Sequence, residues 1–152
     1  MKKKMLISII AILGVAVLII VFYAAPKTIG KNIKASEVDH INVFDGSTGV
    51  GFVIDNPEEI QYIVENIQSR SLKRDGFSFG YTGYSFKINY MDVNDKNILS
   101  EFIVNSDDTI RKDPFFYRCE GGLCFDYLKN MEEKYASNWK IPVYRIDILM
   151  IK

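Results

Sequence analysis

Apolar residues are distributed very unevenly along this chain of 152 residues. An unbroken apolar run extends from Met5 to Ala25, and only Ser8 and Tyr23 bring a hydroxyl group into it. As a helix this run rises about 31 Å, which is close to the hydrocarbon thickness of a bilayer. The run therefore predicts a transmembrane helix, so the membrane is the first expected partner of the chain.

The residues that flank this run predict its orientation. Lys2 to Lys4 precede it, and basic residues beside a span are retained on the cytoplasmic side. A cleaved signal peptide is the alternative, but its apolar core is shorter, roughly 7–15 residues, and it ends in an A-x-A type of site. A cut after Ala24 or Ala25 would place an aromatic residue where that site needs a small one. We therefore expect an uncleaved, single-pass anchor in the cell membrane with its N-terminus inside.

These features divide the chain into four parts. Residues 1–4 form a basic cytoplasmic stub, 5–25 the transmembrane helix and 26–36 a linker. Residues 37–152 are expected outside the cytoplasm. A segment of this length suits one domain with a modest core, and it leaves no room for a second.

Apolar and polar residues alternate along much of the segment beyond the linker, as in half-buried β-strands. The first two alternating runs flank the turn sequence D-G-S-T-G at residues 45–49 and predict a hairpin. Aromatic alternation on either side of Thr82 and Gly83 predicts two more strands joined at this pair. The predicted strands are 38–44, 50–54, 77–81, 84–90, 98–104, 109–112 and 115–117.

Two segments have the apolar spacing of three and four residues that is typical of amphipathic helices. The first begins at Pro57, after a cap by Asp55 or Asn56, and the second runs from Phe125 to Tyr135. A hairpin, a helix, further antiparallel strands and a second helix predict an α+β fold with a curved sheet. The apolar stripe of the first helix is Ile60, Ile63, Val64 and Ile67.

The C-terminal segment from Trp139 to Lys152 is apolar but far too short to span a membrane. Arg145 and Asp147 lie two positions apart, as on the solvent-facing side of a strand. We expect an edge strand that completes the domain's own sheet, and pairing with another chain is the alternative.

The net charge differs between the first 34 residues and the rest of the chain. The whole chain is neutral, but from Ala35 onward it has 13 Lys or Arg against 19 Asp or Glu, a net charge of −6. An acidic domain repels phosphate backbones, which excludes nucleic acid from the expected partners. The lysines at 27, 31 and 34 lie in the linker, where they are either solvated or in contact with anionic headgroups.

Few residues suggest a disulfide, a metal site or a catalytic site. Cys119 and Cys124 flank a Gly-Gly turn, and in an exported domain we expect them to form a disulfide; free thiols are the alternative. The sequence does not supply enough ligands for a zinc site, because the chain has a single histidine, His40, and no other cysteine. We predict no catalytic residue, no metal ligand and no cofactor.

The candidate binding surface is the segment from Gly76 to Tyr84. Aromatic faces on flexible backbone suit the recognition of peptides or sugars. The competing interpretation, which alternation of this kind favours, is that the aromatic residues form one face of the core. The candidate binding residues are Phe77, Phe79, Tyr81 and Tyr84, interleaved with Gly76, Gly80 and Gly83.

Several sequence blocks together resemble a known class of proteins. These are D-G-S-T-G in the first hairpin, G-Y-S-F-K-I-N-Y at 83–90, F-I-V-N-S-D-D-T-I-R-K at 102–112, and F-F-Y-R at 115–118. From Val38 to Tyr135 the chain resembles small extracytoplasmic domains of Gram-positive bacteria, which belong to families of unknown function. Those families have no agreed catalytic residues. The membrane helix in place of a lipobox departs from their usual outline.

These observations predict a membrane-anchored extracytoplasmic domain that works by binding, with an envelope protein or a cell-wall glycan as its partner. One alternative is a hydrolase or transferase acting on envelope material through carboxylates that converge in space. Another is an inhibitor or immunity-type protein that blocks an exported enzyme.

Overall fold

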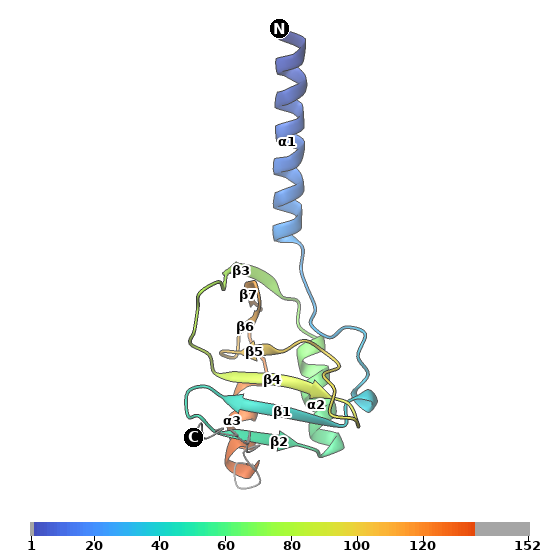
Figure 1. Ribbon diagram of the computed structural model, residues 1–152, viewed down its shortest axis with the longest axis vertical. Coiled ribbons are helices and arrows are strands. Elements are labelled where there is room, and N and C mark those ends of the chain that lie inside the picture. The colour runs from blue at the N-terminus through green and yellow to red at the C-terminus, as the bar shows by residue number, and fades with distance from the viewer. Residues whose placement is uncertain (1, 136–152) are drawn as a thin grey trace, which may run out of the picture.

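The computed structural model describes residues 2–135 and consists of a long helix followed by one folded domain (Figure 1). The helix, α1 (Lys2–Ala24), extends away from the domain, and its side chains from Lys3 to Ala24 are exposed. It is long and apolar enough to cross a membrane. The segment predicted as an edge strand, Trp139 to Lys152, lies outside the described residues.

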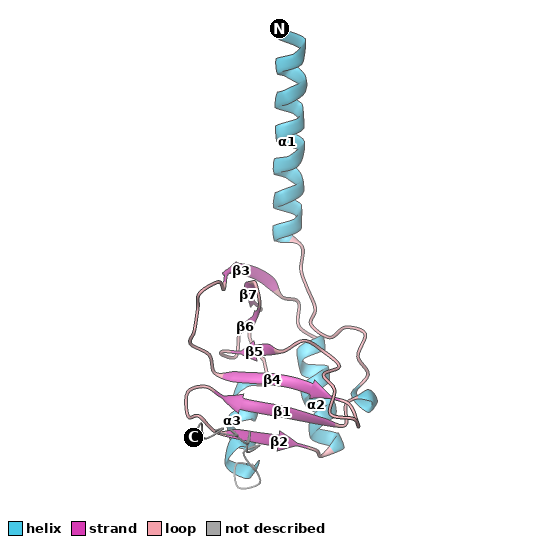
Figure 2. Cartoon of the chain, in the orientation of Figure 1, coloured by secondary structure: helices cyan, strands magenta, loops and turns pink. Residues whose placement is uncertain are grey.

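The domain is built on one antiparallel sheet, as predicted (Figure 2). Within the described chain the sheet has seven strands in the order β2-β1-β4-β5-β6-β7-β3. The strands are β1 (His40–Asp45), β2 (Gly51–Ile54), β3 (Lys73–Phe77), β4 (Phe86–Met91), β5 (Phe102–Val104), β6 (Thr109–Lys112) and β7 (Phe115–Arg118). Figure 2 shows that the sheet is strongly twisted. Strands β1, β2 and β4 are seen along their length, whereas β6 and β7 are seen nearly end-on.

The predicted first hairpin is confirmed. Strands β1 and β2 pair with Ile41 opposite Ile54 and Val43 opposite Phe52, and all four side chains are buried. The turn begins at Asp45, whose carboxylate accepts a hydrogen bond of 2.6 Å from the backbone of residue 47. Alternation with a period of two therefore placed the apolar side chains correctly on the core face.

Both predicted helices of the domain are confirmed, and Figure 2 shows them behind the sheet. In α2 (Pro57–Gln68), Asn56 is the N-cap and accepts hydrogen bonds from the backbone of the first turn. The end of α3 (Phe125–Tyr135) is joined to α2 by Glu59, which binds Lys134 and the Tyr135 hydroxyl at 2.5 Å each. The predicted stripe of α2 is buried in full: Ile60, Ile63, Val64 and Ile67.

Of the two strands predicted around Thr82 and Gly83, the second, 84–90, is confirmed as β4, whereas the first, 77–81, is wrong. Strand β3 ends at Phe77 and pairs with β7, whereas β4 begins at Phe86 and lies between β1 and β5. The segment between them runs from one edge of the sheet to its middle. Its alternating aromatic side chains are exposed, so the alternation does not arise from a buried face. The strand predicted at 98–104 is also shorter and comprises only β5.

The segment predicted as a linker, 26–36, is packed onto the domain. Lys27 and Leu72 exchange backbone hydrogen bonds of 2.7 and 2.9 Å, which extends the sheet by one bridge at β3. Ile29 belongs to the core and is only 4% exposed. The Gln68 side chain donates to the carbonyl oxygens of Gly30 and Ile33 at 2.7 and 2.6 Å. The chain is therefore held against the domain almost from the end of α1, and η1 (Ala35–Glu37) completes this segment.

Candidate functional site

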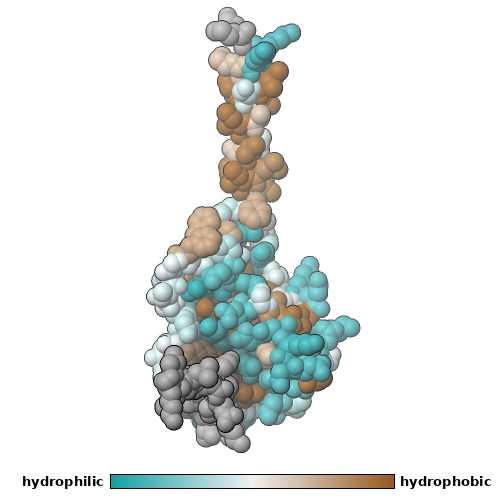
Figure 3. Space-filling model, viewed as in Figure 1, coloured by the Kyte–Doolittle hydropathy of each residue, from teal (hydrophilic) through white to brown (hydrophobic). Residues whose placement is uncertain are grey.

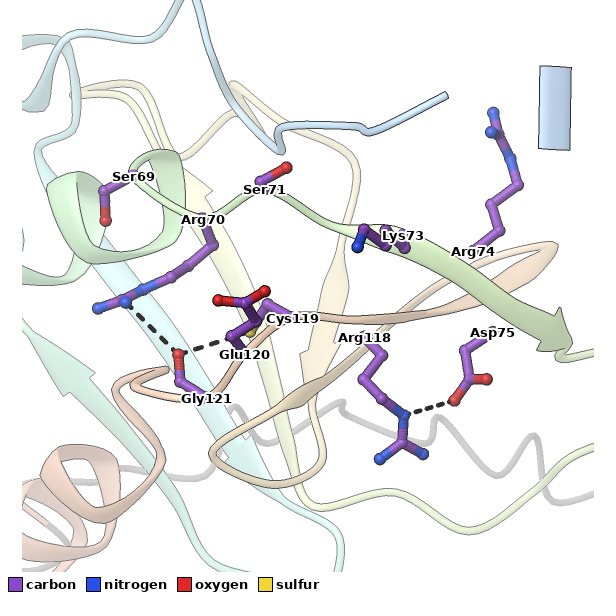
Figure 4. A pocket seen from close by; sticks show the side chains of 10 residues that line it. All are labelled: Ser69, Arg70, Ser71, Lys73, Arg74, Asp75, Arg118, Cys119, Glu120 and Gly121. Atoms are coloured by element: carbon purple, nitrogen blue, oxygen red, sulfur yellow. Dashed lines mark hydrogen bonds and ion pairs between the residues drawn. The ribbon is translucent and has the colours of Figure 1, made fainter. Parts of the chain in front are cut away.

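A groove of about 800 Å³ opens at the edge of the sheet where β3 begins and β7 ends (Figure 4). The end of α2 and the loop after β7 form its other walls. We call it the basic groove, because four of its side chains are cationic and two are acidic. Its lining residues are Ser69, Arg70, Ser71, Lys73, Arg74, Asp75, Arg118, Cys119, Glu120 and Gly121.

Pairing of β3 with β7 brings the two halves of this groove together, because Lys73 lies opposite Arg118 in the sheet. Arg118 is fixed between two carboxylates, with Asp75 at 2.8 Å and Asp108 at 2.7 Å. Hydrogen bonds from the hydroxyls of residues 109 and 106, with a smaller effect of Arg118, lower the pKa of Asp108. These two contacts hold Arg118 in place.

Arg70 lines the opposite wall of the groove and is held by the loop after β7. Its Nη1 donates to the carbonyl oxygen of Gly121 at 3.4 Å. Gly122 has a φ of +77°, which favours glycine, and a Cβ atom there would lie 2.9 Å from the same nitrogen and displace the Arg70 guanidinium. The Nε atom of Arg70 is buried, and it has no hydrogen-bond partner within the described part of the chain.

Lys73 is an exposed cation of the groove, as is Arg118. Lys73 forms no ion pair with any residue that the structure describes, so its ammonium group is available to a ligand. Arg70 and Arg118 line the same groove, with the Arg70 guanidinium turned toward Gly121 and the Arg118 guanidinium toward Asp75 (Figure 4). Such a donor set recognises carboxylate or phosphate groups.

Arg74 connects the groove to the end of α1. Its guanidinium donates to the backbone carbonyl oxygens of Phe22, Tyr23 and Ala25 and lies 4.2 Å from the centre of the Phe22 ring. The last carbonyl groups of a helix lack partners within the helix and carry partial negative charge, so a cation there is favourable. The groove is therefore positioned directly beside the end of the apolar helix.

The four candidate aromatic residues are exposed or half-buried, but they do not form one surface. Phe77 and Phe79 stack on each other near the end of α1, with ring centres 6.2 Å apart. Tyr81 packs edge-on against Phe116 at 5.2 Å. Tyr84 lies elsewhere, against the backbone of the first hairpin, where it fills the space left by Gly46. The interpretation of all four as one core face is therefore wrong, and any binding role of the four remains a prediction.

The expected disulfide is not formed in the structure, in which Cys119 and Cys124 are both free. The loop between them is closed instead by two backbone hydrogen bonds. Cys119 donates to the carbonyl oxygen of Asp108 at 2.9 Å, and Leu123 donates to that of Asp107 at 2.8 Å. Cys119 is half-buried. Burial raises the pKa of the Cys124 thiol to about 12, which makes this thiol unreactive at neutral pH.

Alkylation distinguishes the two cysteines. At pH 8 in the folded protein, iodoacetamide should modify Cys119 while Cys124 stays unmodified, because its raised pKa keeps the buried thiol protonated until the pH approaches 12. Mass spectrometry of tryptic peptides measures both sites. In denaturant without a reductant both should react, whereas resistance of both would show a disulfide and contradict the free thiols.

The remaining candidate, His40, forms no metal site with its neighbours. Its ring nitrogens lie 2.9 Å from Asp39 and 3.5 Å from Asp95. No group of three or more metal-ligating side chains occurs in residues 2–135. We therefore assign His40 to a surface hydrogen-bond network.

The basic groove was not predicted from the sequence. A local signal was present, since S-R-S-L-K-R at 69–74 places three cations within five residues just after α2. Its second half, from Arg118 to Gly121, is about 45 positions away and joins it only through the pairing of β3 with β7. No protein-family model, curated protein or solved structure matches the chain. The resemblance to Gram-positive extracytoplasmic domains therefore stays a prediction.

Proposed function

We propose that the protein is a single-pass membrane protein whose domain lies outside the cytoplasm and binds an anionic group of an envelope partner, either a protein or a cell-wall glycan. Lys2 to Lys4 at the start of α1 support this orientation. The basic groove supports the binding function and is the observation that carries the proposal.

The charge of the groove favours an anionic ligand even though the domain as a whole is acidic. Arg70 and Arg118 are pre-positioned by the contacts described above, so little side-chain entropy is lost when a ligand binds. Lys73 adds a mobile point charge at the exposed side. A carboxylate or phosphate group of a polymer or a peptide is the kind of ligand that such cations bind.

The state of the nearby carboxylates favours binding over acid–base chemistry at this groove. A general acid at neutral pH needs a carboxyl with a raised pKa. The pKa of Asp108 is lowered instead, and Asp75 shares the same arginine. The groove therefore offers positive charge held in fixed positions.

Site-directed photo-crosslinking in living cells tests the proposal. A photoreactive amino acid replaces Ser71, which is exposed in the groove, and Lys129 on α3 carries the same probe as a control. We expect a specific adduct from position 71 and none from position 129. The adduct should be lost when Lys73→Glu reverses the charge of the groove. Lys96→Glu, at an exposed turn after β4, is the matched charge control and should leave the adduct unchanged.

Two results would contradict the proposal. Equal labelling from positions 71 and 129 would mean that the groove has no specific ligand. An adduct that survives Lys73→Glu would mean that the partner does not use the positive charge. If Lys73→Glu abolishes the adduct, mass spectrometry of the adduct formed from position 71 without this substitution identifies the partner as protein or glycan.

A further inference from the structure

Two phenylalanines at the edge of the domain are unusually exposed. Phe77 is 66% exposed and Phe79 is 76% exposed, and their rings stack at an interplanar angle of 13°. Leaving a phenylalanine side chain in water is unfavourable relative to burying it. We call this pair the aromatic edge. Contiguous exposed apolar surface is a feature of sites that contact a protein or a membrane.

A continuous series of aromatic contacts leads from this edge to α1. Phe77 packs on Phe115 with ring centres 5.0 Å apart, and Phe115 meets Tyr23 edge-on at 6.4 Å. Tyr23 lies in the last turn of α1. The space-filling view shows apolar colour over the helix and again on the part of the domain next to the helix end (Figure 3). The apolar surface of α1 therefore continues onto the aromatic edge.

Hydrogen bonds hold the aromatic edge in a defined position relative to α1. The backbone N–H of Gly76 donates to the Tyr23 hydroxyl at 3.0 Å, directly before Phe77 in the chain. Arg74 donates to carbonyl groups of the last turn, and Lys27 pairs with Leu72 three positions after the helix ends. The edge consequently lies at the level where α1 ends.

We infer that the aromatic edge rests in the interfacial layer of the same bilayer that α1 spans, so that the domain has a second, shallow contact with lipid. This inference rests on the membrane anchor proposed above. Tyrosine and tryptophan side chains favour the interface between hydrocarbon and water, where Tyr23 then lies. Phenylalanine is common on the apolar face of segments that lie in this layer. Phe77 and Phe79 are tied to the same level, and the exposed Lys27 lies there too, where anionic headgroups attract a cation.

Lipid is the occupant that fits this surface best, because the edge continues the apolar surface of α1, whose own surroundings are lipid. A protein partner needs an interface of about 800 Å² on each side to bind stably. On the proposed topology, part of the surface around Phe77 and Phe79 is already taken by the helix and by the headgroups beside it. A protein that binds the edge instead is an outcome of the test below.

Quenching by brominated lipid measures this contact in the full chain. The chain has one tryptophan, and Trp139→Phe removes it. In that background, Phe79→Trp places a probe on the aromatic edge, and Val93→Trp places the control. Val93 is 78% exposed, lies in the turn after β4 and lines a hollow beside the start of α2. Strand β4 lies farther from α1 than β3 does (Figure 1). Both variants are reconstituted in vesicles of phosphatidylcholine and phosphatidylglycerol with acyl chains brominated near the headgroup.

We expect quenching several-fold stronger at position 79 than at position 93, and Phe77→Trp should behave as Phe79→Trp does. Equal quenching at 79 and 93, in protein that resists extraction by alkaline carbonate, would overturn the lipid contact and leave the anchor intact. Release of the protein by carbonate would overturn the anchor and the lipid contact together. A probe at position 79 that is shielded from water but not quenched would indicate a protein occupant and would also overturn the inference.

Discussion

Replacing Ile29 by alanine should lower the free energy of unfolding by about 2–4 kcal/mol, because it leaves a cavity in the core. Ile29 is 4% exposed and belongs to the same buried cluster as the residues of α2. For a domain of this size, the loss corresponds to a fall of roughly 10 °C in Tm. Thermal unfolding of the full chain in detergent, followed by near-UV circular dichroism, measures this change.

The control is Asn32→Ala, which changes an exposed position of the same segment. It should change Tm by at most one or two degrees, since surface substitutions usually alter stability by about 0.5 kcal/mol or less. Equal Tm values for Ile29→Ala and the unchanged protein would mean that residues 26–36 are a free linker. The segment would then make no contribution to the core.

Alanine at Gly46 should destabilise the domain by about 1–3 kcal/mol, in the range measured for overpacked sites. A Cβ atom there would lie 2.5 Å from the Tyr84 ring and 2.6 Å from the Tyr84 carbonyl oxygen. The ring can move, but the carbonyl belongs to the backbone next to β4, where Gly46 also donates a hydrogen bond of 3.0 Å to Ser85. The substitution therefore pushes the first hairpin away from the segment that precedes β4.

Gly83→Ala is the matched control for this substitution. Gly83 lies one position before Tyr84, and its Cβ would meet nothing closer than 3.5 Å, which is an ordinary van der Waals distance. Urea unfolding should show a lower midpoint for Gly46→Ala and a nearly unchanged one for Gly83→Ala. If the two variants unfold at the same midpoint, the close packing of Tyr84 on Gly46 does not exist.

Local patterns predicted the elements of this fold better than their arrangement. The spacing in α2, its cap at Asn56 and the first hairpin are each decided within about 15 residues, so propensity and periodicity were sufficient. The partner of β3 was not predictable in this way. Alternation from Phe77 to Tyr81 resembles a strand, but it carries no information about which strand pairs with it.

The basic groove shows the same limit for the site. Lys73 and Arg118 become neighbours only because β3 pairs with β7 at the far edge of the sheet. The net charge calculated from the sequence indicated an acidic domain. It gave no sign that one groove of this domain is lined by more cationic than acidic side chains. The exposure of Phe77 and Phe79 was likewise set by the end of β3 and not by their spacing.

The shortness of the connection between α1 and the domain limits where a ligand can be met. Only Ala25 and Pro26 separate the helix from Lys27, which already pairs with Leu72. Three extended residues span about 10 Å, so on the proposed topology the groove stays close to the outer leaflet. A partner confined to the same plane would be found by lateral diffusion. Occupancy would then follow the number of partner molecules per membrane area, and a distant wall polymer would be sampled only at its membrane-proximal end.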